Sequence, residues 1–212
     1  MIYEIPSSDE PIHQGDIFRY VPRIDINLES LPVANGDSFL LNNWVDAIET
    51  NGSEPITSLV AIKPVIAIVI SQDCDAVRAD DIALAEVVPF ENVESNIKNA
   101  KYPTRTWGVI TKNSRVNLKW FYLPIDLKIG FEKRMAADFR SVLQTSKTFL
   151  ENHRERFRIA RLNDIATQHF RERLSEYFRR YAYDEWYPLD KKEFDEYRKS
   201  KSEPTDPFDW QK

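Results

Sequence analysis

The sequence predicts an α+β fold in which a β-rich N-terminal part is followed by a helical C-terminal part. Apolar runs rich in β-branched residues and separated by turn signals occupy the first 124 residues, whereas apolar residues recur at steps of three and four after residue 133. The chain has 212 residues, 42% of them hydrophobic, which suits a single core. We expect a β-rich domain at residues 1–130, a helical extension packing on it at 131–198 and a flexible tail at 199–212.

The central strand of the β-rich part is predicted at Ser58–Ser71. This segment is dense in β-branched residues and apolar on both faces, as strands in the middle of a sheet are. Pro64 cannot donate a ladder hydrogen bond, so we expect the paired portion to begin after it. A first strand is predicted at Gln14–Pro22, and the residues between 25 and 54 form an elaborated loop in which Asn35-Gly36 indicates a hairpin.

The later elements follow from the same patterns. Ile82–Phe90 reads as another strand, and Thr106–Thr111 with Val116–Pro124 as a late hairpin. From Lys133 the period changes, and a helix is predicted from four apolar residues at helical spacing: Met135, Phe139, Val142 and Leu143. A last helix is predicted to follow Asp164, which we expect to be its N-cap.

Composition indicates a cytoplasmic protein without a membrane anchor. Cys74 is the only cysteine, so an intramolecular disulfide cannot form. The first ten residues are acidic and polar, whereas a signal peptide is basic and then apolar. The longest apolar stretch, Val60–Ile70, contains Lys63 and is about half the ~20 residues that a membrane span needs.

Charge is strongly segregated along the chain. The net charge is -5, but residues 1–100 carry -12, residues 101–183 carry +10 and the remainder carries -3. Such segregation indicates either an acidic partner for the basic half or attraction between the two halves of the chain.

The candidate functional site is the polar segment that ends the central strand. We predict that it contacts a partner through five residues: Ser71, Gln72, Asp73, Cys74 and Asp75. Two other chemistries remain open for this segment. Cys74 can act as a nucleophile only if its pKa is lowered, and the neighbouring aspartates oppose this, so a small buried thiol is expected instead. Asp73 and Asp75 can hold Mg²⁺ together with Asp16 or with Asp80 and Asp81, or they can simply form a turn.

A second candidate surface lies in the basic C-terminal half. Arginine binds phosphate bidentately, and we predict nucleic-acid contacts by four residues: Arg171, Arg173, Arg179 and Arg180. The same segment carries Glu172 and Glu176, so a solvated face with intrahelical ion pairs is an equal alternative. Nucleotide-binding and metalloprotease motifs are missing, so we expect no cofactor and no metal.

Two short motifs resemble the growth-inhibitor toxins of the MazF/PemK type. These are Gly15-Asp16-Ile17 and Lys63-Pro64 followed by a strand that ends in Ser71. The resemblance covers at most residues 12–124 and implies an SH3-like β-barrel, elaborated here by loops and a helical C-terminal extension. It also implies an endoribonuclease alternative, with Ser71 and either Arg19 or Arg23 near the scissile phosphate. The long loop after Asp16 and the Lys in place of Arg depart from the toxin pattern.

A second resemblance spans more of the chain. Ser71–Asp75, Phe121–Pro124 and Arg158–Leu162 are similar to segments of uncharacterised bacterial proteins with a Ser-Gln-Thr/Asp-Cys-Asp motif, which are associated with mobile-element and phage-defence gene neighbourhoods. Together these observations predict a non-catalytic accessory protein of a bacterial multi-protein system that binds a protein or nucleic-acid partner. A toxin-like endoribonuclease is the alternative, and the oligomeric state stays open.

Overall fold

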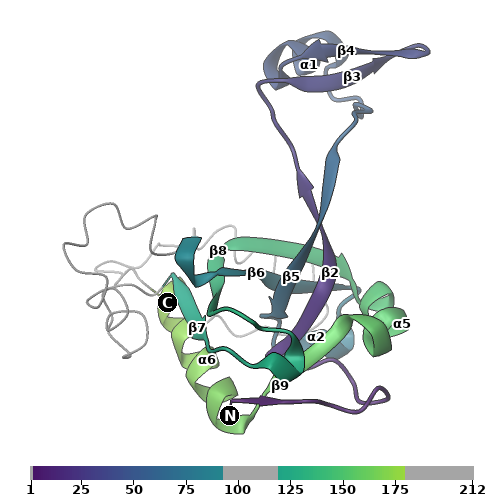
Figure 1. Ribbon diagram of the computed structural model, residues 1–212. Helices are drawn as coiled ribbons and strands as arrows, with labels where there is room; N and C mark the ends of the chain where they lie inside the picture. Colours follow the sequence, from purple (N-terminus) through teal and green to yellow (C-terminus); the bar gives the residue numbers. More distant parts are fainter. Residues whose placement is uncertain (1, 93–118, 180–212) are drawn as a thin grey trace, which may run out of the picture. The chain divides into compact units, whose positions relative to one another are not determined.

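The computed structural model describes residues 2–92 and 119–179 (Figure 1). The strand predicted at Thr106–Thr111, residue Arg180 and the tail at 199–212 lie outside these ranges. The strands are β1 (Tyr3–Glu4), β2 (Asp16–Asp25), β3 (Leu31–Asn35), β4 (Ser38–Asn42), β5 (Ala61–Val69), β6 (Asp81–Pro89), β7 (Trp120–Leu123), β8 (Met135–Ser146) and β9 (Arg158–Leu162). The helices are α1 (Trp44–Asn51), α2 (Asp73–Arg78), the 3-10 turn η1 (Leu127–Ile129), α5 (Lys147–Phe157) and α6 (Asp164–Phe178).

Seven of these strands form one antiparallel sheet in the order β1-β9-β2-β5-β6-β8-β7. The chain is therefore an α+β protein, as predicted, and β5 occupies the middle of the sheet. The SH3-like barrel is not confirmed, because the edge strands β1 and β7 pair with β9 and β8 respectively, and the sheet over the described residues does not close. In those same ranges, no helix has the length and apolar character that crossing a bilayer requires.

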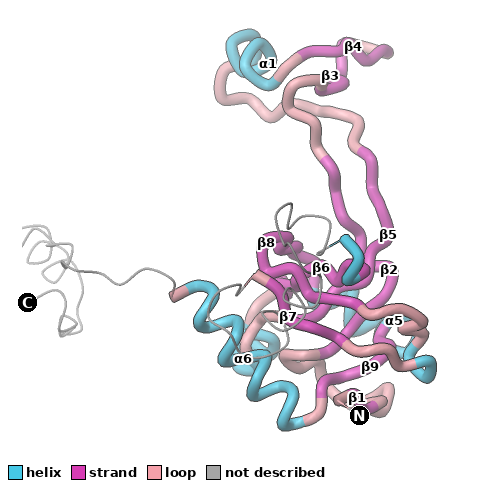
Figure 2. Tube along the Cα trace, turned by 60° about the vertical axis from the view of Figure 1, so that its left-hand side comes forward, coloured by secondary structure: helices cyan, strands magenta, loops and turns pink. Residues whose placement is uncertain are grey.

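Helices cover both faces of this sheet (Figure 2). Adjacent residues of a strand point to opposite faces, and Ile17 accordingly packs in a different apolar cluster from its neighbour Phe18. The Ile17 cluster includes Phe170 of α6, whereas the Phe18 cluster includes Ala76 of α2 and Leu150 of α5. Strand β5 contributes to both clusters, which explains why its sequence is apolar on both faces.

Strands β2 and β5 continue as a two-stranded ribbon beyond their other neighbours (Figures 1 and 2). Pairing of β2 with β9 stops at Phe18, and pairing of β5 with β6 begins at Ile66, yet β2 and β5 stay paired as far as Asp25 and Ala61. Pairing thus includes Pro64, contrary to the expectation that it begins after it. Pro64 lies opposite Pro22. In alternate pairs of an antiparallel ladder neither residue donates a hydrogen bond to the other strand, so two prolines can face each other in such a pair.

The ribbon leads into a small module formed by residues 26–60, which we call the arm module. Strands β3 and β4 form the expected hairpin, and Gly36 has a φ of 59° at the first position of its two-residue turn. Helix α1 follows, and the Asn43 side chain caps it by accepting a hydrogen bond from the Asp46 amide. The chain then returns alongside β3, where the Ala34 amide donates to the Thr57 carbonyl at 2.9 Å.

The helix predicted from Lys133 is wrong, because residues 135–146 form strand β8. Met135 and Phe139 stand four residues apart, which suits a strand as well as a helix, and Ala137 between them is buried in the same cluster as Phe139. A bulge then shifts the register, since Asp138 pairs with Glu86 while Val142 pairs with the adjacent Ala85. This bulge produces the three-residue step that resembled a helical period.

The region expected to be a helical extension therefore contributes two strands as well as two helices. Strand β8 pairs with β6 and β7, and β9 pairs with β1 and β2, so both lie in the sheet built by the N-terminal strands. Helix α6 forms where a last helix was predicted, but it already includes Asp164, and its cap is Asn163, whose side chain accepts a hydrogen bond from the Ala166 amide at 2.9 Å.

Candidate functional site

The predicted site at the end of β5 begins helix α2, and its central residue is Asp73. One carboxylate oxygen accepts the Gln14 amide at 2.8 Å and lies 3.4 Å from His13 Nδ1. The other oxygen accepts a hydrogen bond from Arg171 of α6, whose Nε also donates to the Gln14 side chain at 2.8 Å. The Asp73 side chain is 41% exposed. Asp73 is thus partly accessible to solvent, but it also ties α2 to α6.

These contacts determine the titration of Asp73. Partial burial by itself raises the pKa of this carboxyl, but the Gln14 amide and the positive charges of Arg171 and His13 outweigh that effect and leave the pKa below its ordinary value. A lowered carboxyl pKa contributes stability that is present above the ordinary pKa and is lost as the pH falls through the lowered one.

The variant Arg171→Met is expected to raise the pKa of Asp73 towards its ordinary value, because it removes the charge and the hydrogen bond that favour the carboxylate. Above the ordinary carboxyl pKa the variant is therefore expected to be less stable than the wild type, and this difference shrinks as the pH falls through the lowered pKa of Asp73 in the wild type. NMR titration of the Asp73 carboxyl carbon measures the shift. Arg156→Met removes an exposed arginine of α5 and serves as control. Identical Asp73 titration curves in wild type and Arg171→Met would contradict the role given to Arg171.

The other predicted contact residues divide between the surface and the sheet. Gln72, Cys74 and Asp75 are exposed, so the expectation of a small buried thiol at Cys74 is wrong. The thiol lies in the first turn of α2, where the chain has already left the apolar strand. Ser71 is half-buried, and its hydroxyl accepts the Ala83 amide of β6 at 2.9 Å.

Of the four arginines predicted to bind nucleic acid, only Arg171 and Arg173 lie in α6, and their surroundings differ. Arg171 binds Asp73 and Gln14, and Arg173 is buried, with only 5% of its surface exposed. Arg179 is exposed, and Arg180 lies beyond residue 179, where the description ends. Burial lowers the pKa of Arg173. A buried guanidinium cannot meet a phosphate backbone.

A cluster that the sequence did not reveal surrounds Asp16, which is completely buried. Its carboxylate binds Arg161 Nε at 2.5 Å and Arg158 Nη1 at 3.2 Å, both from β9. Arg161 also pairs with Glu10 at 2.7 Å. Residues about 145 positions apart meet here, and the acidic N-terminal half is thereby attracted to the basic C-terminal half. Asp16 is therefore engaged by two guanidinium groups and is not placed to complete a Mg²⁺ shell with Asp73.

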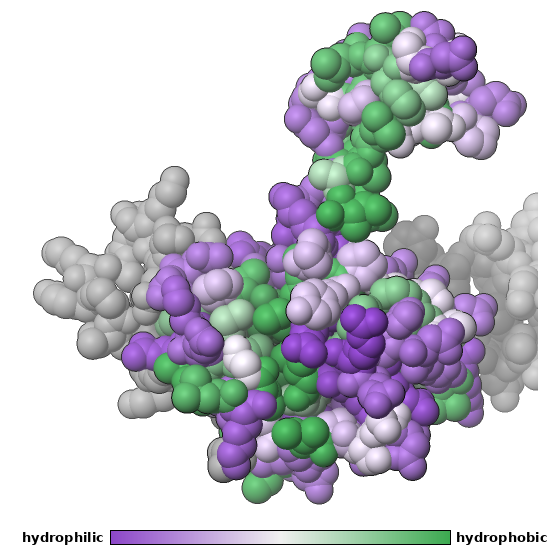
Figure 3. All heavy atoms as spheres, turned by 45° about the vertical axis from the view of Figure 1, so that its right-hand side comes forward, coloured by the Kyte–Doolittle hydropathy of each residue, from purple (hydrophilic) through white to green (hydrophobic). Residues whose placement is uncertain are grey.

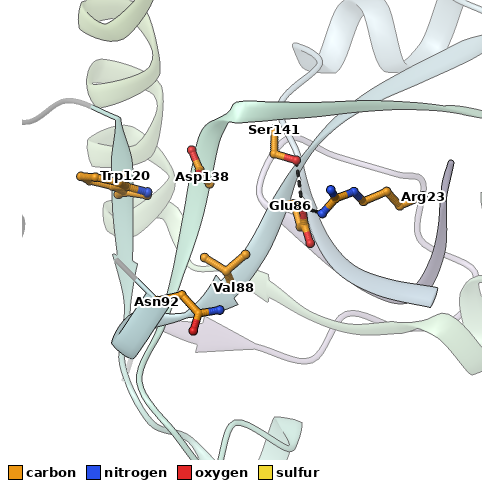
Figure 4. Close-up of a pocket in the computed structure, with 7 residues that line it drawn as sticks. All are labelled: Arg23, Glu86, Val88, Asn92, Trp120, Asp138 and Ser141. Atoms are coloured by element: carbon orange, nitrogen blue, oxygen red, sulfur yellow. Dashed lines mark hydrogen bonds and ion pairs between the residues drawn. The ribbon is translucent and has the colours of Figure 1, made fainter. Parts of the chain in front are cut away.

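A pocket of about 360 Å³ lies beside strands β6, β7 and β8 (Figure 4). Two acids line it, Glu86 and Asp138, which pair directly across β6 and β8 and are each only 8% exposed. Arg23 Nη1 binds Glu86 at 2.7 Å, and the Ser141 hydroxyl donates to the same Glu86 oxygen at 2.8 Å. These residues were missed, although a single acid inside an otherwise apolar run, as in Ile82–Phe90, is a usable signal.

Both acids of this pocket already have cationic partners. Arg140 binds Asp138 at 2.6 Å and lies over the Trp120 ring, 4.8 Å from its centre. Burial by itself raises the pKa of Asp138, but the hydrogen bonds and charge of Arg140 lower it overall. An ionised, arginine-paired carboxylate is a poor proton donor, so Asp138 is not suited to act as a general acid. Within the described ranges, no group of three or more His, Cys, Asp or Glu side chains is placed to hold a metal ion.

The residues implied by the toxin resemblance have separate partners. The Ser71 hydroxyl bonds to β6, Arg19 donates to the Arg156 carbonyl at 3.1 Å, and Arg23 is paired with Glu86 and Asp25. A ribonuclease site needs such groups to converge on one phosphate. The contacts of these residues do not favour the nuclease alternative.

The arm module carries a concentration of exposed apolar side chains (Figure 3). Helix α1 and strand β4 contribute Trp44, Val45 and the pair Leu40 and Leu41, of which Leu41 is 76% exposed. The whole set is Ile26, Leu28, Phe39, Leu40, Leu41, Trp44, Val45, Ile48, Leu59 and Val60. Burying one large apolar side chain removes roughly 60–120 Å² of surface, so this set leaves on the order of 500 Å² of apolar side chain in water. Adjacent residues of β4 point to opposite faces of the hairpin, so these side chains are spread over both faces of the arm module. Exposed apolar surface of this extent favours an interaction site.

Comparison with known proteins adds no relative. No protein-family model matches the chain, and no match is found among curated proteins or among solved structures.

Proposed function

We propose that this chain is a non-catalytic accessory protein of a bacterial multi-protein system and that its arm module binds a protein partner. The observation that carries the proposal is the exposed apolar surface of residues 26–60. Leaving this much apolar surface in water is unfavourable, and covering it would supply binding free energy. The strand-end residues Gln72, Cys74 and Asp75 are exposed and stay predicted as a second contact region.

The arrangement of charged groups supports an interaction protein over a nuclease. Asp16 and Asp73 are bound by arginines of β9 and α6 that hold elements of the fold together, and Asp138 is bound by Arg140 of its own strand. Such pairs stabilise or specify a structure, whereas catalytic carboxylates are kept available for substrate or proton transfer. The motif resemblances predict that the sheet is related to SH3-like barrels. They also predict that the protein acts in phage defence or belongs to a mobile element.

The variant Leu40→Ser with Leu41→Ser tests the proposal. The tagged wild-type chain, expressed in its native cells, is expected to retain a specific partner protein that the double variant loses, because the apolar contact is removed from an exposed hairpin. Leu127→Ser with Ile165→Ser replaces two apolar residues of comparable exposure outside the arm module and serves as the matched control. The partner is identified by mass spectrometry, and its association is then measured with purified components.

Two results would contradict the proposal. One is equal retention of every partner by wild type and by the Leu40 and Leu41 variant, which would remove the arm module from the interaction. The other is degradation of RNA by the purified wild-type chain, with loss of that activity in Ser71→Ala. The expected result is intact RNA after incubation with either protein.

A further inference from the structure

The arm module is acidic as well as apolar, and its charge restricts what can cover it. Residues 26–60 contain no lysine, arginine or histidine. They contain five acids, all of them exposed: Glu29, Asp37, Asp46, Glu49 and Glu54. An apolar surface bordered by charge of a single sign selects its partner by complementarity.

We propose that the arm module binds a basic, amphipathic protein segment, one that presents leucine-like side chains on one face and lysine or arginine beside them. This inference rests on the proposed function and specifies the chemistry of its partner. The apolar face of the segment would cover residues such as Leu41 and Trp44, while its cations would meet the surrounding carboxylates, including Glu49 on α1. Such recognition corresponds to the docking of an amphipathic helix on an apolar surface.

Charge disfavours the other occupants. Nucleic acid and an anionic membrane surface both carry negative charge, which the five carboxylates repel. Two copies of the arm module facing one another would bring ten carboxylates and no cation into one interface.

Three synthetic peptides, each of about 14 residues to allow one helix, test the proposal with the full-length protein. One has leucine at positions i, i+3, i+4 and i+7 and lysine elsewhere, so that it forms a basic amphipathic helix. The second replaces each lysine by glutamate, and the third replaces each leucine by serine. Fluorescence anisotropy of the labelled peptides measures binding. We expect the Leu/Lys peptide to bind at least tenfold more tightly than either of the others, and about tenfold more weakly when salt is raised from about 50 to about 500 mM.

Charge-reversal variants locate the binding site. The first is the triple variant Glu29→Lys with Glu49→Lys and Glu54→Lys. It is expected to weaken binding of the Leu/Lys peptide at least about tenfold. The matched control is the triple variant Glu132→Lys with Glu155→Lys and Glu172→Lys, which changes the net charge equally at exposed positions outside the arm module. It is expected to change the affinity less than about threefold. Circular dichroism confirms that both triple variants fold.

The remaining outcomes overturn the proposal in distinguishable ways. Equal loss in the two triple variants would mean that only the net charge of the protein matters. A second outcome is that the Leu/Glu peptide binds as tightly as the Leu/Lys peptide or more tightly, and that Leu40→Ser with Leu41→Ser abolishes this binding. That outcome would refute the basic partner but leave the arm module as a docking surface, so the proposed function would survive. Absence of binding by all three peptides would overturn this inference. The proposed function would fall only if partner retention is also independent of Leu40 and Leu41.

Discussion

Replacing Asp16 by Asn is expected to destabilise the protein by about 3–5 kcal/mol, the cost of breaking a buried ion pair by removing one partner. Asp16 is completely buried, and the side chains of Arg158 and Arg161 are only 2% and 12% exposed. Asn keeps the shape of the side chain but leaves two nearly buried guanidinium groups without their shared counter-charge. Urea unfolding followed by circular dichroism measures the loss.

The control for this prediction is Asp81→Asn, which removes an exposed carboxylate at the start of β6 and is expected to change the stability by less than about 0.5 kcal/mol. Combining Asp16→Asn with Arg158→Met tests the pairing directly. Because the two residues share one interaction, the double variant should be more stable than the sum of the single losses predicts. Additive losses would show that the Asp16 and Arg158 side chains act independently.

Phe170→Ala is expected to cost about 3–5 kcal/mol, the usual range for deleting a buried aromatic ring. Phe170 is completely buried where α6 packs on the sheet, and its ring centre lies 5.1 Å from that of Phe121 and 5.6 Å from that of Phe139. Alanine would leave a cavity among rings contributed by β7, β8 and α6. Chemical denaturation measures the change in the free energy of unfolding.

Ile165→Ala in the same helix is the matched control, because Ile165 is 68% exposed and its truncation creates no cavity. A loss from Phe170→Ala no larger than that from Ile165→Ala would mean that α6 does not depend on this aromatic cluster for its attachment.

The central strand and its neighbours were predictable because the pattern of apolar residues along each segment indicates how deeply it is buried. Strand β5 is apolar on both faces and lies in the middle of the sheet, and the Asn35-Gly36 signal marks the observed hairpin between β3 and β4. Strand β8 was not predictable in this way. Its bulge opposite Glu86 interrupts the alternation of side chains, so spacing alone could not distinguish it from a helix.

The polar clusters show a second limit of local reasoning. Asp73 was predicted from the sequence as a contact residue, but its partner Arg171 stands 98 positions later in the chain. Asp16 was considered only as a metal ligand or motif residue, and nothing near it in sequence indicates that β9 brings two arginines to it. Charge segregation along the chain was the one available signal, and the attraction between the halves that it suggested is realised at Asp16.

The two facing prolines of the β2–β5 ribbon have a consequence for the behaviour of the chain at high concentration. An exposed two-stranded ribbon with apolar side chains such as Ile24 and Ile62 is a template on which strands of other molecules can assemble into larger sheets. Pro22 and Pro64 each remove an amide donor from an outer edge at the same level of the ribbon. Both free edges are thereby protected from intermolecular strand addition, while their side chains remain open to solvent.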